Sequence, residues 1–298
     1  MERLVVSASA DAPSAFRSVF RTVFVLAGLA TAAVAGPAAA WDDLGHRVVA
    51  DLAYARLTPE AKAQVDALVA GGSQEPSCPV ASLADAAVFP DCVDGLRPYR
   101  DLRPLHFEAR PFCPAEARGD PCKDGECVTE AVKRAAAQLR DPALPPAQRL
   151  YALEQLAHFV ADLHQPLNMI DNRDDGGRDI RVALPGSADR RLNLHDFWND
   201  NVVALAVGSE ELGYRWLQPV ALAGQRWDEG GIDAWGSETA ALARDIYSRL
   251  PQPPECGRRT RDPETLDRGY VSAAVPIARE QLAKAGVRLA ALLNAALR

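Results

Sequence analysis

Five histidines are the side chains in this sequence best suited to bind a metal ion: His46, His106, His158, His164 and His195. His158 and Asp162 lie four residues apart in a stretch of helical periodicity, so their side chains project from the same helix face. An imidazole nitrogen and a carboxylate oxygen both ligate Zn²⁺, and a carboxylate can bridge two ions. The pair therefore predicts a metal site, with an ordinary solvated His–Asp contact as the alternative. His195 and Asn199 repeat the same spacing.

The first forty residues predict a segment that is removed from the protein. Arg17 and Arg21 precede an apolar run over residues 23–35, and small residues follow as far as Ala40. This order is typical of a secretory signal peptide cleaved after Ala40. A membrane anchor is the alternative, but the run is shorter than the roughly 20 residues that span a bilayer. We therefore expect residues 1–40 to be a signal peptide and residues 41–298 to be the mature domain.

Cleavage at that position would create a further metal ligand. Trp41 would become the first residue, and its α-amine, with a pKa of about 8, can bind zinc in the neutral form. His46 follows five residues later. The first turn of a helix can fold it back toward the same ion.

Composition limits the class of protein. The chain has 298 residues, a formal net charge of −7 and 48% hydrophobic residues. These values exclude sustained disorder, collagen-like repeats and a basic nucleic-acid-binding tail. All six cysteines follow residue 40. An even number of cysteines in an exported chain predicts three disulfides. Cys122 and Cys127 are near enough in sequence to close a local loop, but the sequence leaves the full pairing open. No later segment is apolar enough to span a membrane, so we expect a secreted or periplasmic monomer.

The hydrophobic periodicity predicts one mainly helical domain. Helices are expected over residues 44–53, 58–68, 128–139, 147–164, 237–250 and 273–297 and near residue 196. Thr58 and Thr129 are candidate N-caps, and residues 73–114 are expected to hold only short helical stretches. Residues 179–184 alternate polar with apolar before Pro185-Gly186, which predicts a small β-hairpin.

Taken in order along the chain, these residues resemble the S1/P1 nuclease family. The matching motifs are Trp41-x4-His46, Phe89-x-Asp91, His106-Phe107, the run from His158 to Leu167, Gly176-Gly177 and Asn193-Leu194-His195-x2-Trp198. Further matches are Trp235-x2-Glu238 and the run from Ala285 to Asn294, so the resemblance covers nearly all of residues 41–298. It implies an all-α fold of the phospholipase C/P1 nuclease type, with three zinc ions in a cleft.

Position by position, the resemblance implies two complete zinc sites. The ligands of the first are Asp91, His106, His158 and Asp162. The ligands of the second are the amine and carbonyl of Trp41, the ring of His46, and Asp162 as a bridge. Asp91 and Asp162 would be the catalytic carboxylates, acting through water that the two ions activate for attack on phosphorus.

Two neighbouring residues have other expected roles. Phe107 would stack against a nucleobase, with ordinary core packing as the alternative. His164 has no ligand role and is expected to hydrogen-bond near the end of its helix.

The sequence departs from the family pattern at the third zinc site. The matching positions are Asn168, His195 and Asn199, where the family has His, His and Asp. One imidazole and two neutral amides are poor zinc ligands, so we expect this site to be weak or absent. A second departure is Asp94, where many relatives carry a basic residue that can face the phosphate. Arg97, Arg100 and Arg103 are the candidates to take the place of that cation, and the alternative is that Asp94 is simply solvated on a loop.

The leading hypothesis is an exported zinc-dependent endonuclease. Its expected reaction is hydrolysis of single-stranded RNA and DNA to 5′-nucleotides, with 3′-nucleotidase activity as an additional expectation. One alternative is a zinc phospholipase C-like phosphodiesterase. Another is a nucleic-acid-binding relative whose catalysis has been weakened, as Asn168, Asn199 and Asp94 would suggest.

Overall fold

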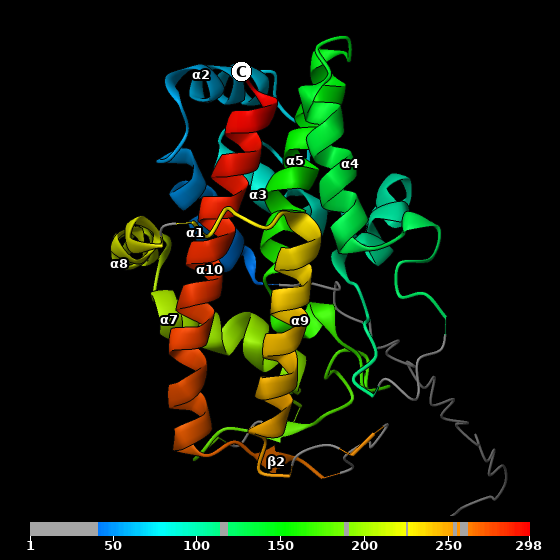
Figure 1. The fold of residues 1–298 in the computed structure, drawn as a ribbon, viewed down its shortest axis with the longest axis vertical. Coiled ribbons are helices and arrows are strands. Elements are labelled where there is room, and N and C mark those ends of the chain that lie inside the picture. The colour runs from blue at the N-terminus through cyan, green and yellow to red at the C-terminus, as the bar shows by residue number, and fades with distance from the viewer. Residues whose placement is uncertain (1–40, 114–118, 188–190, 225, 253–254, 257–261) are drawn as a thin grey trace, which may run out of the picture. The chain divides into compact units, whose positions relative to one another are not determined.

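Helices connected by loops make up most of the described chain (Figure 1). The computed structural model describes residues 41–113, 119–187, 191–224, 226–252, 255–256 and 262–298, so the predicted signal peptide lies outside the described residues. The main helices are α1 (Asp43–Tyr54), α2 (Pro59–Val69), α3 (Leu83–Val93), α4 (Val128–Arg140), α5 (Pro146–Leu163), α8 (Glu210–Ala223), α9 (Ile232–Ser248) and α10 (Arg268–Ala296). The expected mainly helical architecture is therefore confirmed.

Short elements connect these helices. Tight 3₁₀ turns cover Arg97–His106, Lys123–Gly125 and Pro166–Met169. The single turn α6 (Leu194–Asp196) continues through a π-helical turn, Phe197–Asn201, into α7 (Val202–Val207). Among the described residues, no helix is both long and apolar enough to cross a bilayer.

Local side-chain chemistry sets where the first helices begin. The Asp42 carboxylate accepts a hydrogen bond from the Gly45 amide at 2.9 Å and so caps α1. Thr58 caps α2 with Pro59 at the first position, as predicted. The predicted cap at Thr129 is wrong, because α4 begins at Val128 after Cys127 and the Thr129 hydroxyl donates to Glu108 instead.

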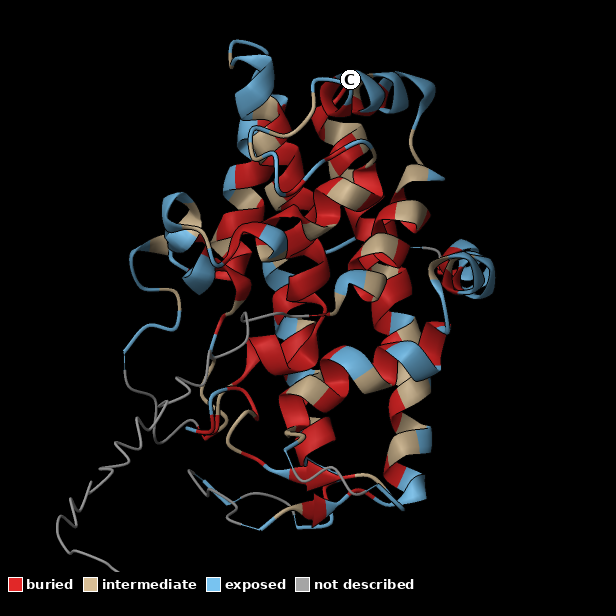
Figure 2. Cartoon of the chain, turned by 180° about the vertical axis from the view of Figure 1, so that it is seen from behind, coloured by how far each residue is buried: buried red, intermediate tan, exposed pale blue. Residues whose placement is uncertain are grey.

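Helix α5 lies in the middle of the core and packs against α1, α3, α4 and α10. Every residue from Leu156 to Leu163 is buried, which is unusual for an amphipathic helix and typical of one enclosed on all sides (Figure 2). His158 and Asp162 belong to this buried stretch. Their side chains are therefore held by packing before any ligand binds.

A glycine lets α10 approach the helix that carries His46. A Cβ atom at Gly286 would lie 2.6 Å from the Cβ of Leu52 on α1, well inside van der Waals contact. The backbones of α1 and α10 can pack this closely only because Gly286 has no side chain. This contact fixes α1 against the core.

The structure differs from the sequence expectations in two elements. α8 was not predicted, and it contains Pro219 in its interior. Among the described residues, which leave out 188–190, the expected β-hairpin is represented by one isolated antiparallel bridge between Arg181 and Asn193. The two-residue strand β1 (Val182–Ala183) pairs in parallel with β2 (Glu264–Thr265).

The six cysteines form three disulfides, as expected: Cys78–Cys92, Cys113–Cys256 and Cys122–Cys127. Cys122 and Cys127 close the local loop that their spacing indicated. Cys113–Cys256 joins segments 143 residues apart, directly after the loop that follows Phe107 and near the C-terminal end of α9. Cys92 lies on α3 and Cys127 directly precedes α4, so two bridges tie loops to helices, whereas Cys113–Cys256 joins two loops.

Candidate metal centre

Four side chains from three segments converge on one point. Asp91 comes from α3, His106 ends the 3₁₀ turn, and His158 and Asp162 come from α5. The Oδ2 atom of Asp162 lies 2.9 Å from His106 Nδ1 and 3.2 Å from His158 Nε2, and these two nitrogens are 3.1 Å apart. Asp91 Oδ1 lies 3.7 Å from the first nitrogen and 3.6 Å from the second.

These five of the six distances between the four donor atoms are close to the edge length of a zinc coordination tetrahedron. A tetrahedral ion with bonds of about 2.0–2.1 Å holds its ligand atoms about 3.3 Å apart. The five distances above scatter around that value. Within the described part of the chain, Asp91 Oδ1 is buried without a hydrogen-bond partner. A buried carboxylate oxygen without a donor is costly unless a cation sits beside it, so these residues fit a zinc ion.

Backbone carbonyls orient two of the imidazoles. His158 Nδ1 donates to the Ala87 carbonyl at 2.7 Å, and His46 Nδ1 donates to the Asp42 carbonyl at 3.1 Å. Because a carbonyl only accepts, the neutral rings carry their lone pairs on Nε2. Both Nε2 atoms face Asp162, and a carbonyl behind the ligating ring is the usual second contact in zinc sites.

The second predicted group shares Asp162 with the first. His46 Nε2 lies 3.0 Å from Asp162 Oδ1, so the two carboxylate oxygens face different imidazoles. The rings of His46 and His158 are stacked with centroids 4.1 Å apart. Trp41 is fully buried directly before the cap of α1. The start of the predicted mature chain therefore lies at the same helix turn as His46.

Burial and charge together perturb the titration of this cluster. Burial by itself lowers the pKa of His46, but the hydrogen bond and charge of Asp162 outweigh burial and raise it to about 9. Burial raises the pKa of Asp91 to about 6, against the opposing charges of His158 and His46. Burial also acts to raise the pKa of Asp162, yet the imidazoles hold it well below its usual value. The cluster thus favours positive charge among its carboxylates, from protons or from a metal ion.

The three residues expected at a weak third site are each buried, and Asn168 contacts the backbone of Asp162. Asn168 Nδ2 donates to the Asp162 carbonyl at 3.3 Å, and Asn199 Oδ1 accepts from Gln165 at 2.5 Å. His195 Nδ1 donates to the Gly176 carbonyl at 2.9 Å, while its Nε2 lies 2.8 Å from an Arg178 guanidinium nitrogen. Gly176 has φ +59, and a Cβ at this position would lie 2.8 Å from the Leu167 carbonyl oxygen. A glycine is therefore needed to place the Gly176 carbonyl against His195.

The remaining predicted residues lie around the cluster. Phe107 is half-buried, with its ring centroid 6.0 Å from that of His106 and 6.2 Å from that of His195. His164 caps the end of α5 and hydrogen-bonds through both nitrogens, donating to Val160 and accepting from Arg288. It is no ligand in this geometry, as expected.

The Asp94 carboxylate is shielded from solvent and has a cationic partner. Its carboxylate is buried and pairs with the guanidinium of Arg103, with Oδ1 2.9 Å from Nε and Oδ2 3.1 Å from Nη2. Of the three arginines, Arg103 is therefore the one engaged with Asp94. The negative charge of Asp94 is neutralised locally.

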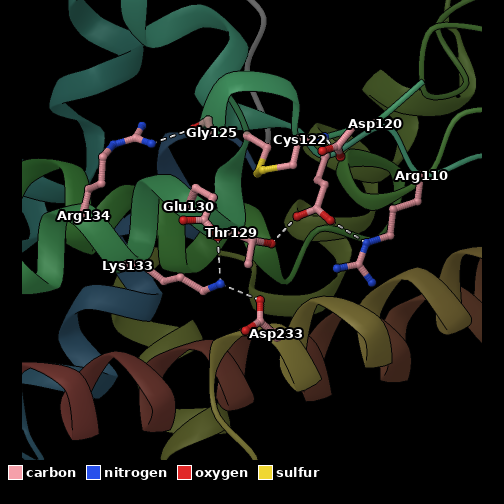
Figure 3. The surroundings of a disulfide bond; sticks show 11 residues. Arg110, Asp120, Cys122, Gly125, Thr129, Glu130, Lys133, Arg134 and Asp233 are labelled. Carbon is pink, nitrogen blue, oxygen red and sulfur yellow. Dashed lines mark hydrogen bonds and ion pairs between the residues drawn. A yellow bond between two sulfur atoms is a disulfide. The ribbon is translucent and has the colours of Figure 1, made fainter. Parts of the chain in front are cut away.

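A second group of possible ligands, Glu108, Cys122 and Cys127, is not a metal centre. The two sulfurs form a disulfide, so neither can act as a thiolate. Glu108 already accepts from Thr129 and from Arg110 (Figure 3). Lys133 in the same region bonds both Glu130 and Asp233, which ties α4 to α9.

Comparison with known proteins identifies the family. The family model described as S1/P1 Nuclease matches residues 41–298. The chain belongs to the S1/P1 nuclease family. It is 27% identical to Endonuclease 2 of Arabidopsis thaliana over 278 residues, covering 85% of this chain and 89% of that protein. It is 28% identical to Endonuclease 4 of the same plant, covering 94% and 95%, and 27% identical to Nuclease S1 of Aspergillus oryzae, covering 61% of each.

Membership of the S1/P1 nuclease family makes the protein a metal-dependent phosphodiesterase that acts on nucleic acid. The buried donors around Asp162 are candidate ligands for that metal. Sequence reasoning missed the carbonyls of Asp42 and Ala87, which carry no sequence signal. It also missed Arg178, although this residue directly follows the Gly176-Gly177 motif.

Proposed function

We propose that this nuclease is an exported zinc enzyme that cleaves single-stranded RNA and DNA to 5′-nucleotides, with 3′-nucleotidase activity on mononucleotides. The observation that carries the proposal is the convergence of four donor atoms, one each from Asp91, His106, His158 and Asp162, with five of their six mutual distances near the edge length of a zinc tetrahedron. Export is supported by the three disulfides, which form in oxidising compartments. Residues 1–40 act as the signal peptide in this proposal, and the mature domain begins at Trp41.

Each side chain in the centre has a distinct task. Asp91, His106 and His158 hold one zinc ion, while His46 and the amine and carbonyl of Trp41 hold a second. Asp162, with Oδ1 toward His46 and Oδ2 toward His106, would serve as a ligand to both ions. A zinc pair of this kind supplies a nucleophilic water at neutral pH and neutralises charge on the phosphoryl oxygens.

Residues around the zinc ligands orient the substrate. Phe107, half-buried next to His106, offers a ring face on which any base can stack, which favours broad base specificity. The carbonyls behind His46 and His158 keep their Nε2 lone pairs on the metal side. The overall charge of −7 does not attract a polyanion, so binding depends on this local positive centre.

The test uses the protein that begins at Trp41, loaded with zinc and freed of excess metal. We expect it to cut a single-stranded oligonucleotide faster than the matching duplex, to release 5′-phosphorylated products, and to lose activity with a chelator. Cleavage of phosphatidylcholine but not of the oligonucleotide would instead support a phospholipase C-like enzyme. Tight oligonucleotide binding without cleavage over hours would indicate a catalytically weakened relative, the possibility that Asn168 and Asn199 raise.

A further inference from the structure

Arg178 makes an unusual contact with the histidine of the third site. Its Nη2 atom lies 2.8 Å from His195 Nε2, and His195 Nδ1 donates to the Gly176 carbonyl at 2.9 Å. Because Nδ1 carries the proton, Nε2 must accept the hydrogen bond from the guanidinium. The lone pair that would bind a metal ion is therefore directed at a fixed positive charge.

The other two residues expected at the third site do not favour a metal ion either. Asn199 Oδ1 accepts from the Gln165 amide at 2.5 Å, and Asn168 Nδ2 donates to the backbone of Asp162. Neutral amides contribute no charge to hold a zinc ion, and an arginine cation beside the site repels one. The residues present therefore do not fit a third zinc ion.

The guanidinium lies against the proposed stacking platform. Its central carbon lies 4.9 Å from the centroid of the Phe107 ring, a cation–π distance. Phe107 directly follows the ligand His106, and the two ring centroids are 6.0 Å apart. Arg178 is thus separated from a proposed zinc ligand by a single aromatic ring.

The Arg178 guanidinium has N–H groups left with which to bind a ligand. A guanidinium has five N–H donors in a planar fork that matches two phosphate oxygens. Within the described residues, Arg178 donates to His195 and, at 3.3 Å, to the Asp175 carbonyl. Its side chain is only partly buried, so the other N–H groups can reach a substrate phosphate.

We propose that the Arg178 guanidinium, held by His195 and the Phe107 ring, binds the phosphate of the scissile phosphodiester in the position where the resemblance implies a third zinc. There it stabilises negative charge on the leaving 3′ oxygen, so the centre works with two zinc ions and one arginine. This inference rests on the proposed nuclease reaction. His195 is then a positioning residue that orients the guanidinium.

The test replaces Arg178 by methionine, which keeps much of the length and removes the charge, and by lysine, which keeps the charge without the fork. We expect Arg178→Met to lower kcat/KM on a single-stranded oligonucleotide about 100-fold, as loss of one transition-state donor does. It should also weaken inhibition by inorganic phosphate. Arg178→Lys should recover part of both. Arg181→Met, three residues along the same segment, is the matched control and should stay within about twofold of the parent.

Zinc content separates this role from a structural one. Elemental analysis should give about two zinc ions per chain in the parent, and Arg178→Met should retain both. Asn168→His with Asn199→Asp should leave the parent count unchanged, because the guanidinium still occupies His195 Nε2. Parent-like activity and phosphate inhibition in Arg178→Met, loss of zinc from that variant, or a third zinc in the double variant would each overturn the inference. A parent protein that cuts no oligonucleotide would refute the proposed function itself.

Discussion

Replacing Asp162 by asparagine tests whether one carboxylate links the two proposed zinc sites. Its Oδ1 faces His46 and its Oδ2 faces His106 and His158, all within 3.2 Å. Asparagine keeps the size but supplies a single oxygen and no charge. Its amide nitrogen must then face either His46 or the other two rings, where it donates a hydrogen bond into a lone pair that should bind zinc. At least one site is therefore lost and the other is weakened.

The size of the effect follows from ligand linkage. Zinc at a free concentration 100 times its Kd stabilises the native state by about 2.7 kcal/mol per site, and therefore by about 5 kcal/mol for two sites. In a domain of this length 1 kcal/mol shifts Tm by about 2–4 °C, so zinc should raise the Tm of the parent by about 10–20 °C. For Asp162→Asn we expect less than half of that shift. We also expect kcat/KM to fall by at least about 100-fold. Removing a residue that only hydrogen-bonds a metal ligand costs up to about 100-fold, and Asp162 is a proposed ligand itself.

The assay compares Tm with and without zinc in the parent, in Asp162→Asn and in a matched control. Asp94→Asn is suitable because Asp94 is also buried but pairs with Arg103 rather than with the imidazoles. The control should lose some stability and keep the full zinc-dependent shift. A parent-like shift and two zinc ions in Asp162→Asn would refute the assignment of Asp162 as the bridge.

The other predictions concern the chain start, a buried acid and the disulfides. Adding one residue before Trp41 should lower the bound zinc measured by elemental analysis toward one per chain, because the amine moves out of reach; unchanged content would exclude the amine as a ligand. Burial raises the pKa of Glu154 to about 8 from 4.5, so the native state keeps a proton that the unfolded state releases, and stability falls as pH rises between these values. The free energy of unfolding of Glu154→Gln, measured in urea melts, should therefore increase relative to that of the parent between pH 5 and 8, by at most about 5 kcal/mol. A difference between variant and parent that does not change with pH would contradict this. A disulfide stabilises a protein by restricting the unfolded chain, and it does so more when the loop it closes is longer. Removing Cys113–Cys256, which closes a span of 143 residues, should therefore lower the free energy of unfolding by about 5 kcal/mol, and removing Cys122–Cys127 by about 2 kcal/mol. Equal losses of Tm would argue against this explanation.

Local patterns in the sequence predicted the parts of the fold that depend on nearby residues. Thr58-Pro59 begins a helix because the cap and the fixed proline φ act within one turn. His158 and Asp162 share a face because helical spacing requires it. Asp91 and His106 were assigned only through the resemblance, since nothing near them in sequence indicates a common ligand.

The features that were missed depend on contacts between distant segments. β1 pairs with residues 264–265, about 80 positions away, so the alternating pattern around it could not identify its partner. α8 contains Pro219, which usually argues against a helix. The direction of the Arg178 side chain is set by His195 and Phe107 in the folded protein, so its role was not visible in the sequence.

The most direct test of the two-zinc centre is anomalous X-ray scattering at the zinc edge from crystals of the protein that begins at Trp41. We expect two peaks on opposite sides of the Asp162 carboxylate, one among Asp91, His106 and His158 and the other beside His46 and the Trp41 amine. No peak should appear beside His195, where Arg178 donates to the ring. A single peak, or zinc bound away from Asp162, would contradict this expectation.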